Sequence, residues 1–583
     1  MFMPFYQRKT QLPMTIARPW IHHYDKGVPH TLEPYPEHTL VDIVRKRASE
    51  HPQTPAMHFK GRELSYGLIE TESNALAESL KELGVAPGDR VAMLMPNSPQ
   101  MIIGELAVWK TGAIVVPLNP LYTENELAYA LNECGAETVI VLSAFYGKIR
   151  SVSPDTRLRR VIATSIKEYL PPLKNLLFTL LKEKKDGHRI ELQKGDFQLQ
   201  DLIRRHVGAG ARPMPVSREA PALFLFSGGT TGNPKCAVST HSSLVISGMQ
   251  IAAWFSVILE RGKDSIILNM PLFHVYGQAG IMPAALMGGY PLVLIPNPRD
   301  LDDLLHSIRS LRPAVLPGVP TLFTALLNHP AVKKRPAVMQ SIKLCVSGAA
   351  PLMQETKRSF EELTGGRIID AYSLTETTLA STFTPIHGTY KPGSVGIPVP
   401  DVEVRIVDQE AGTSVLGSGE VGEVLMRAPQ LMKEYWQNPE ETALVLRDGW
   451  LYTGDLGYLD EDGYLFIVDR KKDVIKPGGF QVWPRDVEEV IARHPAVQEV
   501  SVAGVPDAYK VEAVKAWVVL RSGHTLAADE LCDYCRKDLA AYKIPRHVEF
   551  IEALPKSTVG KVLRRKLVEE HCRRQGIQGN DFR

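Results

Sequence analysis

Apolar residues recur at two different spacings between residues 64 and 142. From Leu68 to Leu83, leucine and isoleucine return at helical spacing, which predicts a helix that Gly84 ends. Short apolar runs after it predict strands, and the segments between them keep helical spacing. The expected strands are 91–95, 113–118 and 138–142, and the expected helices between them are 101–111 and 124–134. This β-α-β-α-β order indicates a largely parallel sheet with helices on both faces.

The same alternation resumes near Pro221 and continues to about residue 400, after which the pattern changes twice. Short alternating runs first predict strands at 402–407 and 422–427. Beyond Asp469, the expected elements are helix 484–494, strands 497–505 and 513–520, helix 527–539 and a basic tail. We therefore expect an α/β fold. A large N-terminal region (1–468) would hold helix-covered, largely parallel sheets and a β-rich subdomain, and a smaller α+β C-terminal domain would span 469–583.

Residues 165–219 interrupt this rhythm with an apolar stretch that runs into a basic one. Within 173–189, five leucines and a phenylalanine precede Lys182, Lys184, Lys185 and Arg189. A basic amphipathic helix of this kind can lie on a membrane surface, and it can equally pack on its own domain. A second apolar stretch, 279–296, is long enough to span a bilayer. Its prolines and glycines favour a buried helix, a turn and a strand instead.

Composition narrows the class of protein. The chain has 583 residues, 44% hydrophobic and 23% charged, with a formal net charge of +2. A nucleic-acid partner would require a stronger basic excess, so we expect none. Six cysteines are too sparse for a disulfide framework and fit a reducing, cytoplasmic location. Cys532 and Cys535 form one CxxC on a predicted helix without a second pair, which favours helix cysteines over a metal or redox site. The N-terminus lacks the apolar run of a secretory signal.

The strongest local chemical signal is FSGGTTGNPK, at 226–235, directly after the apolar run ALFLF. Glycines allow successive backbone N–H groups to approach phosphate oxygens, and hydroxyls and a lysine add donors. The lysine lies outside the Walker A register, and a plain surface loop is the alternative. The candidate phosphate-binding residues are Ser227, Gly228, Gly229, Thr230, Thr231, Gly232 and Lys235.

SGGTTGNPK resembles the phosphate-binding signature of the adenylate-forming superfamily, which includes acyl-CoA synthetases, luciferases and peptide-synthetase adenylation domains. The resemblance spans nearly the whole chain, because further motifs follow in the family's order. They are PLFHVYG (271–277), SGAAPL (347–352), DAYSLTET (370–377), WLYTGDLGYLDEDGY (450–464), VDRKKDVIKPGGFQVWP (468–484) and PKSTVGKVLRR (555–565).

The resemblance implies a site for ATP with Mg²⁺. Glu376 and Thr230 would bind the metal ion, and Thr375 and Thr230 would bind phosphate oxygens. For the base, Tyr372 would stack on adenine and Asp370 would accept its amine. Asp455 would accept the ribose hydroxyls, with Arg470 donating beside it. Small residues that would let the base lie against the backbone are Gly348, Ala349 and Ala350, and Ala371 is a further expected nucleotide-binding residue.

The resemblance also implies two reaction steps. Lys561 would bridge the acid and the α-phosphate during adenylation, and His274 would border the carboxylate pocket. The mobile C-terminal domain would then rotate about Asp469 and admit the thiol of coenzyme A. Residues that would serve this second arrangement are Lys472, Lys476, Gly478, Gly479 and Gln481. Cys236, Ala371 and Ser373 stand where the family has glycines; all are small, so we expect the fold to tolerate them.

The segments 116–136, 448–460 and 479–491 are most similar to bacterial long-chain fatty acyl-CoA ligases. Gly277, Ala279 and Gly280, after His274, would leave room for an acyl tunnel or serve ordinary helix packing. The expected partners are a fatty acid, ATP and CoA, with a homodimer and peripheral contact with the inner face of the membrane left open. The alternatives are an aryl (coumarate-type) CoA ligase, a non-catalytic nucleotide-binding relative, and a membrane-anchored lipid transporter.

Overall fold

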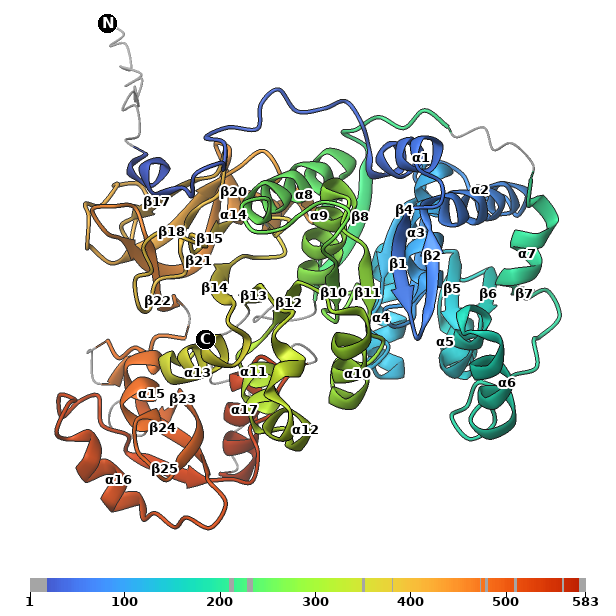
Figure 1. Cartoon of the computed structure of the whole chain (residues 1–583). Coiled ribbons are helices and arrows are strands. Elements are labelled where there is room, and N and C mark those ends of the chain that lie inside the picture. The colour runs from blue at the N-terminus through green and yellow to red at the C-terminus, as the bar shows by residue number, and fades with distance from the viewer. Residues whose placement is uncertain are drawn as a thin grey trace, which may run out of the picture.

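The protein is seen in a computed structural model that describes residues 18–208, 214–227, 234–348, 352–379, 381–471, 473–477, 481–507, 511–557 and 560–575 (Figure 1). The N-terminal region contains two large sheets and a smaller β-rich subdomain. The C-terminal domain lies against one end of it, at the lower left of Figure 1. The α/β architecture expected from the apolar spacing is confirmed.

The first large sheet has eight strands in the order β19-β9-β8-β4-β3-β5-β6-β7. Its central pairs, from β8 through β7, are parallel, whereas β9 pairs antiparallel with both β8 and β19. The strands are β3 (Arg90–Leu94), β4 (Ile114–Pro117), β5 (Thr138–Leu142), β6 (Arg160–Thr164), β7 (Phe197–Gln198), β8 (Pro221–Ser227), β9 (Lys235–Thr240) and β19 (Glu434–Tyr435).

The second large sheet has nine strands in the order β16-β15-β14-β13-β12-β10-β11-β1-β2 and is parallel from β14 to β1. The strands are β1 (Pro55–Phe59), β2 (Arg62–Ser65), β10 (Ile266–Leu268), β11 (Leu292–Leu294), β12 (Val315–Gly318), β13 (Leu344–Ser347), β14 (Arg367–Tyr372), β15 (Thr382–Phe383) and β16 (Ile397–Pro398). The carboxyl ends of β13 and β14 carry two of the expected nucleotide motifs.

Helices fill the space between the two sheets and cover their outer faces. Val91 and Met93 of β3 face a core shared with the second sheet, whereas Ala92 and Leu94 face the outer helices. The inner helices are α1 (Leu40–Glu50), α2 (Tyr66–Glu82), α3 (Pro99–Lys110), α8 (His241–Phe255) and α9 (Met282–Gly288). The outer helices are α4 (Glu124–Cys134) and α5 (Tyr146–Val152) on the first sheet. On the second they are α10 (Leu301–Leu311), α11 (Pro320–Asn328), α12 (Pro330–Lys334) and α13 (Gln354–Thr364).

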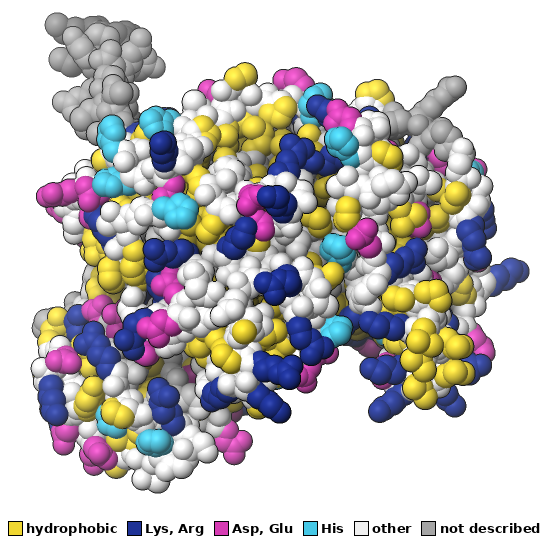
Figure 2. Space-filling model, in the orientation of Figure 1, with side chains coloured by type: hydrophobic (Ala, Val, Ile, Leu, Met, Phe, Trp, Pro, Cys, Tyr) yellow, Lys and Arg dark blue, Asp and Glu magenta, His cyan; other side chains and the backbone are white. Residues whose placement is uncertain are grey.

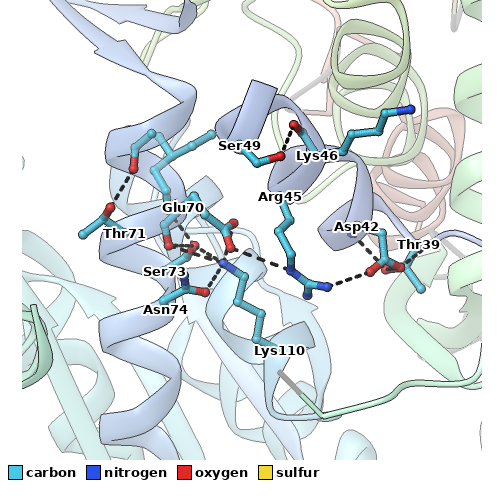
Figure 3. Close-up of polar contacts among 12 residues, drawn as sticks. Thr39, Asp42, Arg45, Lys46, Ser49, Glu70, Thr71, Ser73, Asn74 and Lys110 are labelled. Atoms are coloured by element: carbon cyan, nitrogen blue, oxygen red, sulfur yellow. Dashed lines mark hydrogen bonds and ion pairs between the residues drawn. The ribbon is translucent and has the colours of Figure 1, made fainter. Parts of the chain in front are cut away.

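A buried lysine joins the inner helices (Figure 3). Lys110, at the end of α3, is 1% exposed and reaches oxygens of three residues of α2. Its Nζ lies 2.8 Å from Glu70 Oε2, 2.7 Å from Ser73 Oγ and 2.7 Å from Asn74 Oδ1. Burial lowers the pKa of Lys110 to about 8, although Glu70 opposes the shift. The ammonium group therefore forms a buried polar contact between α2 and α3.

The β-rich subdomain is an antiparallel sheet of β17 (Glu403–Val407), β18 (Gly422–Arg427), β20 (Leu446–Arg447), β21 (Trp450–Leu459) and β22 (Leu465–Arg470), with α14 (Pro439–Val445) beside it. The C-terminal domain has a core of its own around Ile475, Val487, Val502, Val518 and Leu531. Its elements are α15 (Pro484–Ala492), β23 (Val497–Asp507), β24 (Val511–Leu520), α16 (Ala528–Cys535), β25 (His547–Phe550) and α17 (Arg564–Arg574).

The two apolar stretches have different outcomes. Residues 279–296 form the end of a π-helix (Tyr276–Ile281), then α9 and β11, and are mostly buried, as the prolines and glycines predict. No helix in the described parts of the chain is both long and apolar enough to cross a bilayer. In the stretch 173–189, α6 (Pro172–Leu181) has no buried residue, so packing on its own domain does not cover its leucines. It precedes α7 (Leu199–His206).

Candidate active site

The ends of β13 and β14 place the expected adenine-side residues together. Gly348 directly follows β13, and Ser347 of that strand pairs with Asp370 of β14. A side chain at Gly348 would meet the ring of Tyr276 at 3.5 Å and the carbonyl oxygen of Ala371 at 3.8 Å, so the glycine adjoins both. Burial raises the pKa of Asp370 to about 6. This carboxyl can therefore change its protonation state near neutral pH.

Three of the expected nucleotide residues form one hydrogen-bonded group. Asp455 on β21 and Arg470 on β22 are cross-strand partners, and Arg470 Nε lies 3.1 Å from Asp455 Oδ1. Tyr372 Oη donates to the other carboxylate oxygen, Oδ2, at 2.6 Å. Desolvation and the charge of Asp455 raise the pKa of Tyr372 well above its ordinary value, so the phenol keeps its proton. Two separate motifs, DAYSLTET and TGD, thus meet at a single carboxylate.

Glu376 is held by a residue that the sequence motifs do not mark. Tyr435 Oη donates to Glu376 Oε1 at 2.7 Å, and the N–H of Met432 donates to the Glu376 carbonyl at 2.8 Å. Tyr435 belongs to β19, which pairs with β9. It lies 59 positions from Glu376, and nothing in the local sequence pattern connects the two.

The same tyrosine contacts the expected phosphate-binding lysine. Lys235 Nζ lies 5.2 Å from the Tyr435 ring centroid, over its face, and forms an ion pair with Glu441 of α14. Ser227 and Lys235 face each other at the ends of β8 and β9, and the Ser227 hydroxyl donates to the Lys235 carbonyl at 3.4 Å. The two strands thus fix both ends of the expected phosphate loop.

The turn after Glu376 is tightly constrained. The N–H of Thr378 donates to the Thr375 carbonyl at 3.1 Å, and Thr378 and Leu379 have φ angles of 49° and 77°, which is unusual for residues with side chains. A Cβ at Gly280 would lie 1.9 Å from Leu379 Cδ2, and one at Gly277 would lie 2.4 Å from the carbonyl oxygen of Met270. Protein atoms fill the space beside both glycines, which supports helix packing over a tunnel at these two positions.

His274 and Lys561 come from different domains and influence each other. His274 Nδ1 accepts the N–H of Tyr276 at 3.2 Å, which assigns the ring proton to Nε2. Burial and, second, the positive charge of Lys561 lower the pKa of His274 to about 4, so the imidazole is neutral at pH 7. The turn that carries Lys561 faces the N-terminal region, since a Cβ at Gly560 would lie 3.2 Å from Thr321 Oγ1.

Asp469, the expected hinge, contacts both domains. It lies near the end of β22, pairs with Leu456 of β21, and accepts the N–H of Arg485 in α15 at 3.0 Å. Arg564 of α17 lies 3.4 Å from the same carboxylate and 2.8 Å from both oxygens of Glu488. Burial raises the pKa of Asp469, and the charge of Arg564 opposes that shift.

Several expected site residues lie outside the described part of the chain: Gly228, Gly229, Thr230, Thr231, Gly232, Ala349, Ala350, Lys472, Gly478 and Gly479. Lys476 and Gln481 are described, and both are exposed. They flank the bridge between Ile475 and Val482, and the N–H of Lys476 donates to Glu512 at 2.6 Å within the C-terminal domain.

The donor groups fit a magnesium ion held mainly by a nucleotide. Among the described residues, no three histidine, cysteine or acidic side chains gather as a metal site. Mg²⁺ usually takes one or two carboxylates together with phosphate oxygens and water, and half-buried Glu376 can supply such a carboxylate. Cys532 and Cys535 are unpaired on α16, as expected for helix cysteines, and burial raises the pKa of Cys535 to about 11.

Comparison with known proteins agrees with this geometry. The chain matches the AMP-binding enzyme family over residues 44–436 and the AMP-binding enzyme C-terminal domain over 486–561. It is 38% identical to a long-chain-fatty-acid–CoA ligase of Bacillus subtilis, covering 97% of this chain and all of that protein. It is 36% identical to one of Salmonella typhimurium, covering 94% and 98%.

Solved structures give the same result. The crystal structure of an anthranilate–CoA ligase in complex with anthranoyl-AMP superposes with a TM-score of 0.82 at 28% identity, covering 93% of this chain and 99% of that one. ATP-bound MatB from Rhodopseudomonas palustris gives 0.78 at 28% identity, covering 91% and 99%. The chain therefore belongs to the AMP-binding enzyme family, as an adenylate-forming CoA ligase that uses ATP, Mg²⁺ and coenzyme A.

Proposed function

We propose that the protein converts a long-chain fatty acid to its CoA thioester. The observation that supports the ligase chemistry is that the turn carrying Lys561 faces the N-terminal region: a Cβ at Gly560 would lie 3.2 Å from Thr321 Oγ1, and the charge of Lys561 adds to the lowered pKa of His274. The acid class is supported by relatives named long-chain-fatty-acid–CoA ligase that match 94% or more of the chain.

In the first step, a carboxylate oxygen forms a bond to the α-phosphorus of ATP, and the bond to pyrophosphate breaks. Negative charge gathers where the two anions meet, and the Lys561 ammonium offsets it. Neutral His274 can lie beside the carboxylate without protonating it, because its pKa of about 4 leaves it uncharged. Mg²⁺ would further neutralise the phosphates, with Glu376 as its protein ligand.

Asp455, Tyr372 and Arg470 would position the nucleotide during this step. Arg470 balances the charge of Asp455, while the carboxylate keeps acceptor capacity for ribose hydroxyls. Asp370, at the end of β14, would accept the adenine amine in its ionised form. The hydrogen-bonded group of Asp455, Tyr372 and Arg470 supports these roles.

In the second step, the CoA thiol releases its proton to solvent and its sulfur bonds to the acyl carbon. The bond between that carbon and the AMP phosphate oxygen breaks, and AMP leaves. We propose that residues 469–583 rotate as a unit about Asp469 between the two steps. The domain has its own core, and Asp469 links β22 to α15 and α17. In the arrangement described here, Lys561 faces the N-terminal region, which suits adenylation.

We also propose that the chain works in the cytoplasm and contacts the inner face of the membrane. All six cysteines are unpaired, as a reducing compartment requires. Long-chain acids partition into bilayers, and the exposed leucines of α6 are flanked by basic residues.

The test is pyrophosphate release with Mg-ATP from a panel of acids, from acetate through palmitate to coumarate, with and without CoA. We expect the highest kcat/KM with long aliphatic acids and acyl-CoA only when CoA is present. A maximum at aryl acids would assign the chain to the coumarate type. No release with any acid, while ATP still binds, would favour the non-catalytic relative.

A further inference from the structure

One face of α6 is apolar and open to solvent. Its five leucines stand at positions i, i+3, i+4, i+7 and i+8, the spacing of a single helix face. Their exposed fractions run from 46% to 71%, for Leu173, Leu176, Leu177, Leu180 and Leu181. Figure 2 shows them as one yellow group at the lower right, bordered by dark blue basic side chains. A contiguous apolar face of this kind on a protein surface indicates a partner.

The helix is held by its opposite face, so the open face has a fixed direction. Asn175 Nδ2 donates to the Lys167 carbonyl at 2.8 Å, and Lys174 Nζ donates to the Lys60 carbonyl at 2.7 Å. The Phe178 ring meets His188 edge-on, with centroids 5.3 Å apart. Figure 1 shows α6 projecting from the molecule on the side away from the C-terminal domain.

Basic residues border the leucines. Lys182, Lys184, Lys185 and Arg189 are all exposed. The acidic residues of the segment 182–189 are Glu183, which pairs with Lys167 at 2.6 Å, and Asp186. The border therefore carries an excess of positive charge.

We propose that this surface, the leucine face of α6 with the basic segment 182–189, docks on an anionic lipid bilayer. The inference rests on the proposed function to the extent that a membrane stores the substrate acid. An amphipathic helix with cations beside its apolar face lies in the interface plane, with leucines among acyl chains and lysines at headgroup phosphates. The ten residues of α6 form a helix about 15 Å long, which suits this position and cannot span the bilayer.

The positive charge of the basic segment 182–189 favours an anionic bilayer over a second copy of the chain as the partner of the leucine face. A second copy of the chain docked leucine face to leucine face would bring the two basic borders together, and like charges oppose that contact. Anionic headgroups instead match the lysines while the acyl chains cover the leucines. The same docking would place the enzyme where long-chain acids concentrate.

The test measures partitioning onto phosphatidylglycerol-containing and pure phosphatidylcholine vesicles, without ATP or CoA. The binding variants are Leu173→Gln/Leu180→Gln/Leu181→Gln and Lys182→Gln/Lys184→Gln/Lys185→Gln. A matched control replaces exposed apolar residues elsewhere, as Leu121→Gln/Val207→Gln/Val415→Gln. Glutamine keeps helix propensity, and all of the replaced side chains are exposed, so the fold should hold.

We expect wild type and the control to bind the anionic vesicles, with binding that weakens as salt rises. The lysine variant should lose about fivefold in partition coefficient for each cation removed. The leucine variant should lose at least about tenfold. Thioester formation should fall in the leucine variant when palmitate is supplied in vesicles and stay unchanged when it is supplied as monomer.

Equal partitioning of wild type and the leucine variant would overturn the proposal. Equal binding of the wild type to phosphatidylglycerol-containing and pure phosphatidylcholine vesicles would also overturn it. A dimer of the wild type that the leucine variant loses would assign the face to a second copy and also overturn it. Vesicle binding is read without catalysis, so failure of the ligase function would appear separately, as absent thioester from monomeric acid.

Discussion

At the scale of single residues, the site depends on side chains that hold other side chains. Tyr435 has no place in the nucleotide motifs, yet its hydroxyl fixes one oxygen of Glu376 and its ring lies under Lys235. A carboxylate oriented in advance loses less conformational freedom when it binds a cation. We therefore assign Tyr435 as a positioning residue for Glu376, the proposed magnesium ligand.

Tyr435→Phe removes that hydroxyl and keeps the ring under Lys235. We expect the Mg²⁺ concentration for half-maximal pyrophosphate release to rise about tenfold, because a hydrogen bond to a charged group contributes about 1.5 kcal/mol. The KM for the acid should stay unchanged. Tyr452→Phe is the matched control, since its hydroxyl donates to the Gly412 carbonyl and not to a site residue. An unchanged Mg²⁺ dependence in Tyr435→Phe would remove Tyr435 from this role.

Lys561 gives a second prediction at this scale. Lys561→Ala should slow adenylation by at least about a hundredfold, because the developing charge loses its cation. Thioester formation from supplied acyl-adenylate should largely persist, because the proposed second step uses another face of the C-terminal domain. The measurement compares pyrophosphate release with acyl-CoA formation from acyl-AMP. Lys556→Ala, the matched control, removes a nearby lysine that pairs with Glu499, and adenylation should remain. Equal loss of both steps would contradict the separation.

At the scale of elements, the helices and strands that apolar spacing predicted individually lie close to their expected bounds. The bounds of α4, β5 and β18 agree with the prediction, while α15 ends two residues early at Ala492 and α16 ends four residues early at Cys535. Spacing also predicted that α6 has an apolar face, but spacing alone does not say what covers that face. The contacts Tyr435–Glu376 and Leu379–Gly280 were not predictable, because they join segments far apart in the sequence.

Lys110 links α3 to α2, so its replacement should lower the free energy of unfolding. Lys110→Met leaves Glu70, Ser73 and Asn74 without their shared donor, so we expect a free energy of unfolding lower by about 3 kcal/mol at pH 7. The measurement is chemical unfolding followed by tryptophan fluorescence. Lys110→Met/Glu70→Gln removes the stranded carboxylate and should recover part of the loss. Equal stability of wild type and Lys110→Met would contradict the role of the contact.

The pKa of Lys110 also determines how the stability difference between wild type and Lys110→Met changes with pH. In the folded chain it is about 8, whereas an unfolded lysine has a pKa of about 10.4. Between these values the unfolded chain holds a proton that the folded chain has released. Stability of the wild type relative to Lys110→Met should therefore rise with pH across this window.

At the scale of the whole molecule, Asp469 lies where the two domains meet: its strand pairs with β21, and its carboxylate contacts Arg564 of α17. Arg564 joins Asp469 to Glu488 and lies three positions after Lys561 in the chain. Lys561 and Arg564, the charge partner of the expected hinge residue Asp469, thus lie in one short segment that leads into α17. A rotation about Asp469 would carry both together while the core of the C-terminal domain stays intact.

The imidazole of His274 can report the position of the C-terminal domain. Its proton affinity depends in part on a charge that arrives from the other domain. Each arrangement of the two domains should therefore give the His274 ring a different NMR chemical shift. Isotope-labelled histidine would then report which arrangement the protein occupies during the catalytic cycle. Domain position could then be followed during turnover without attaching any external label.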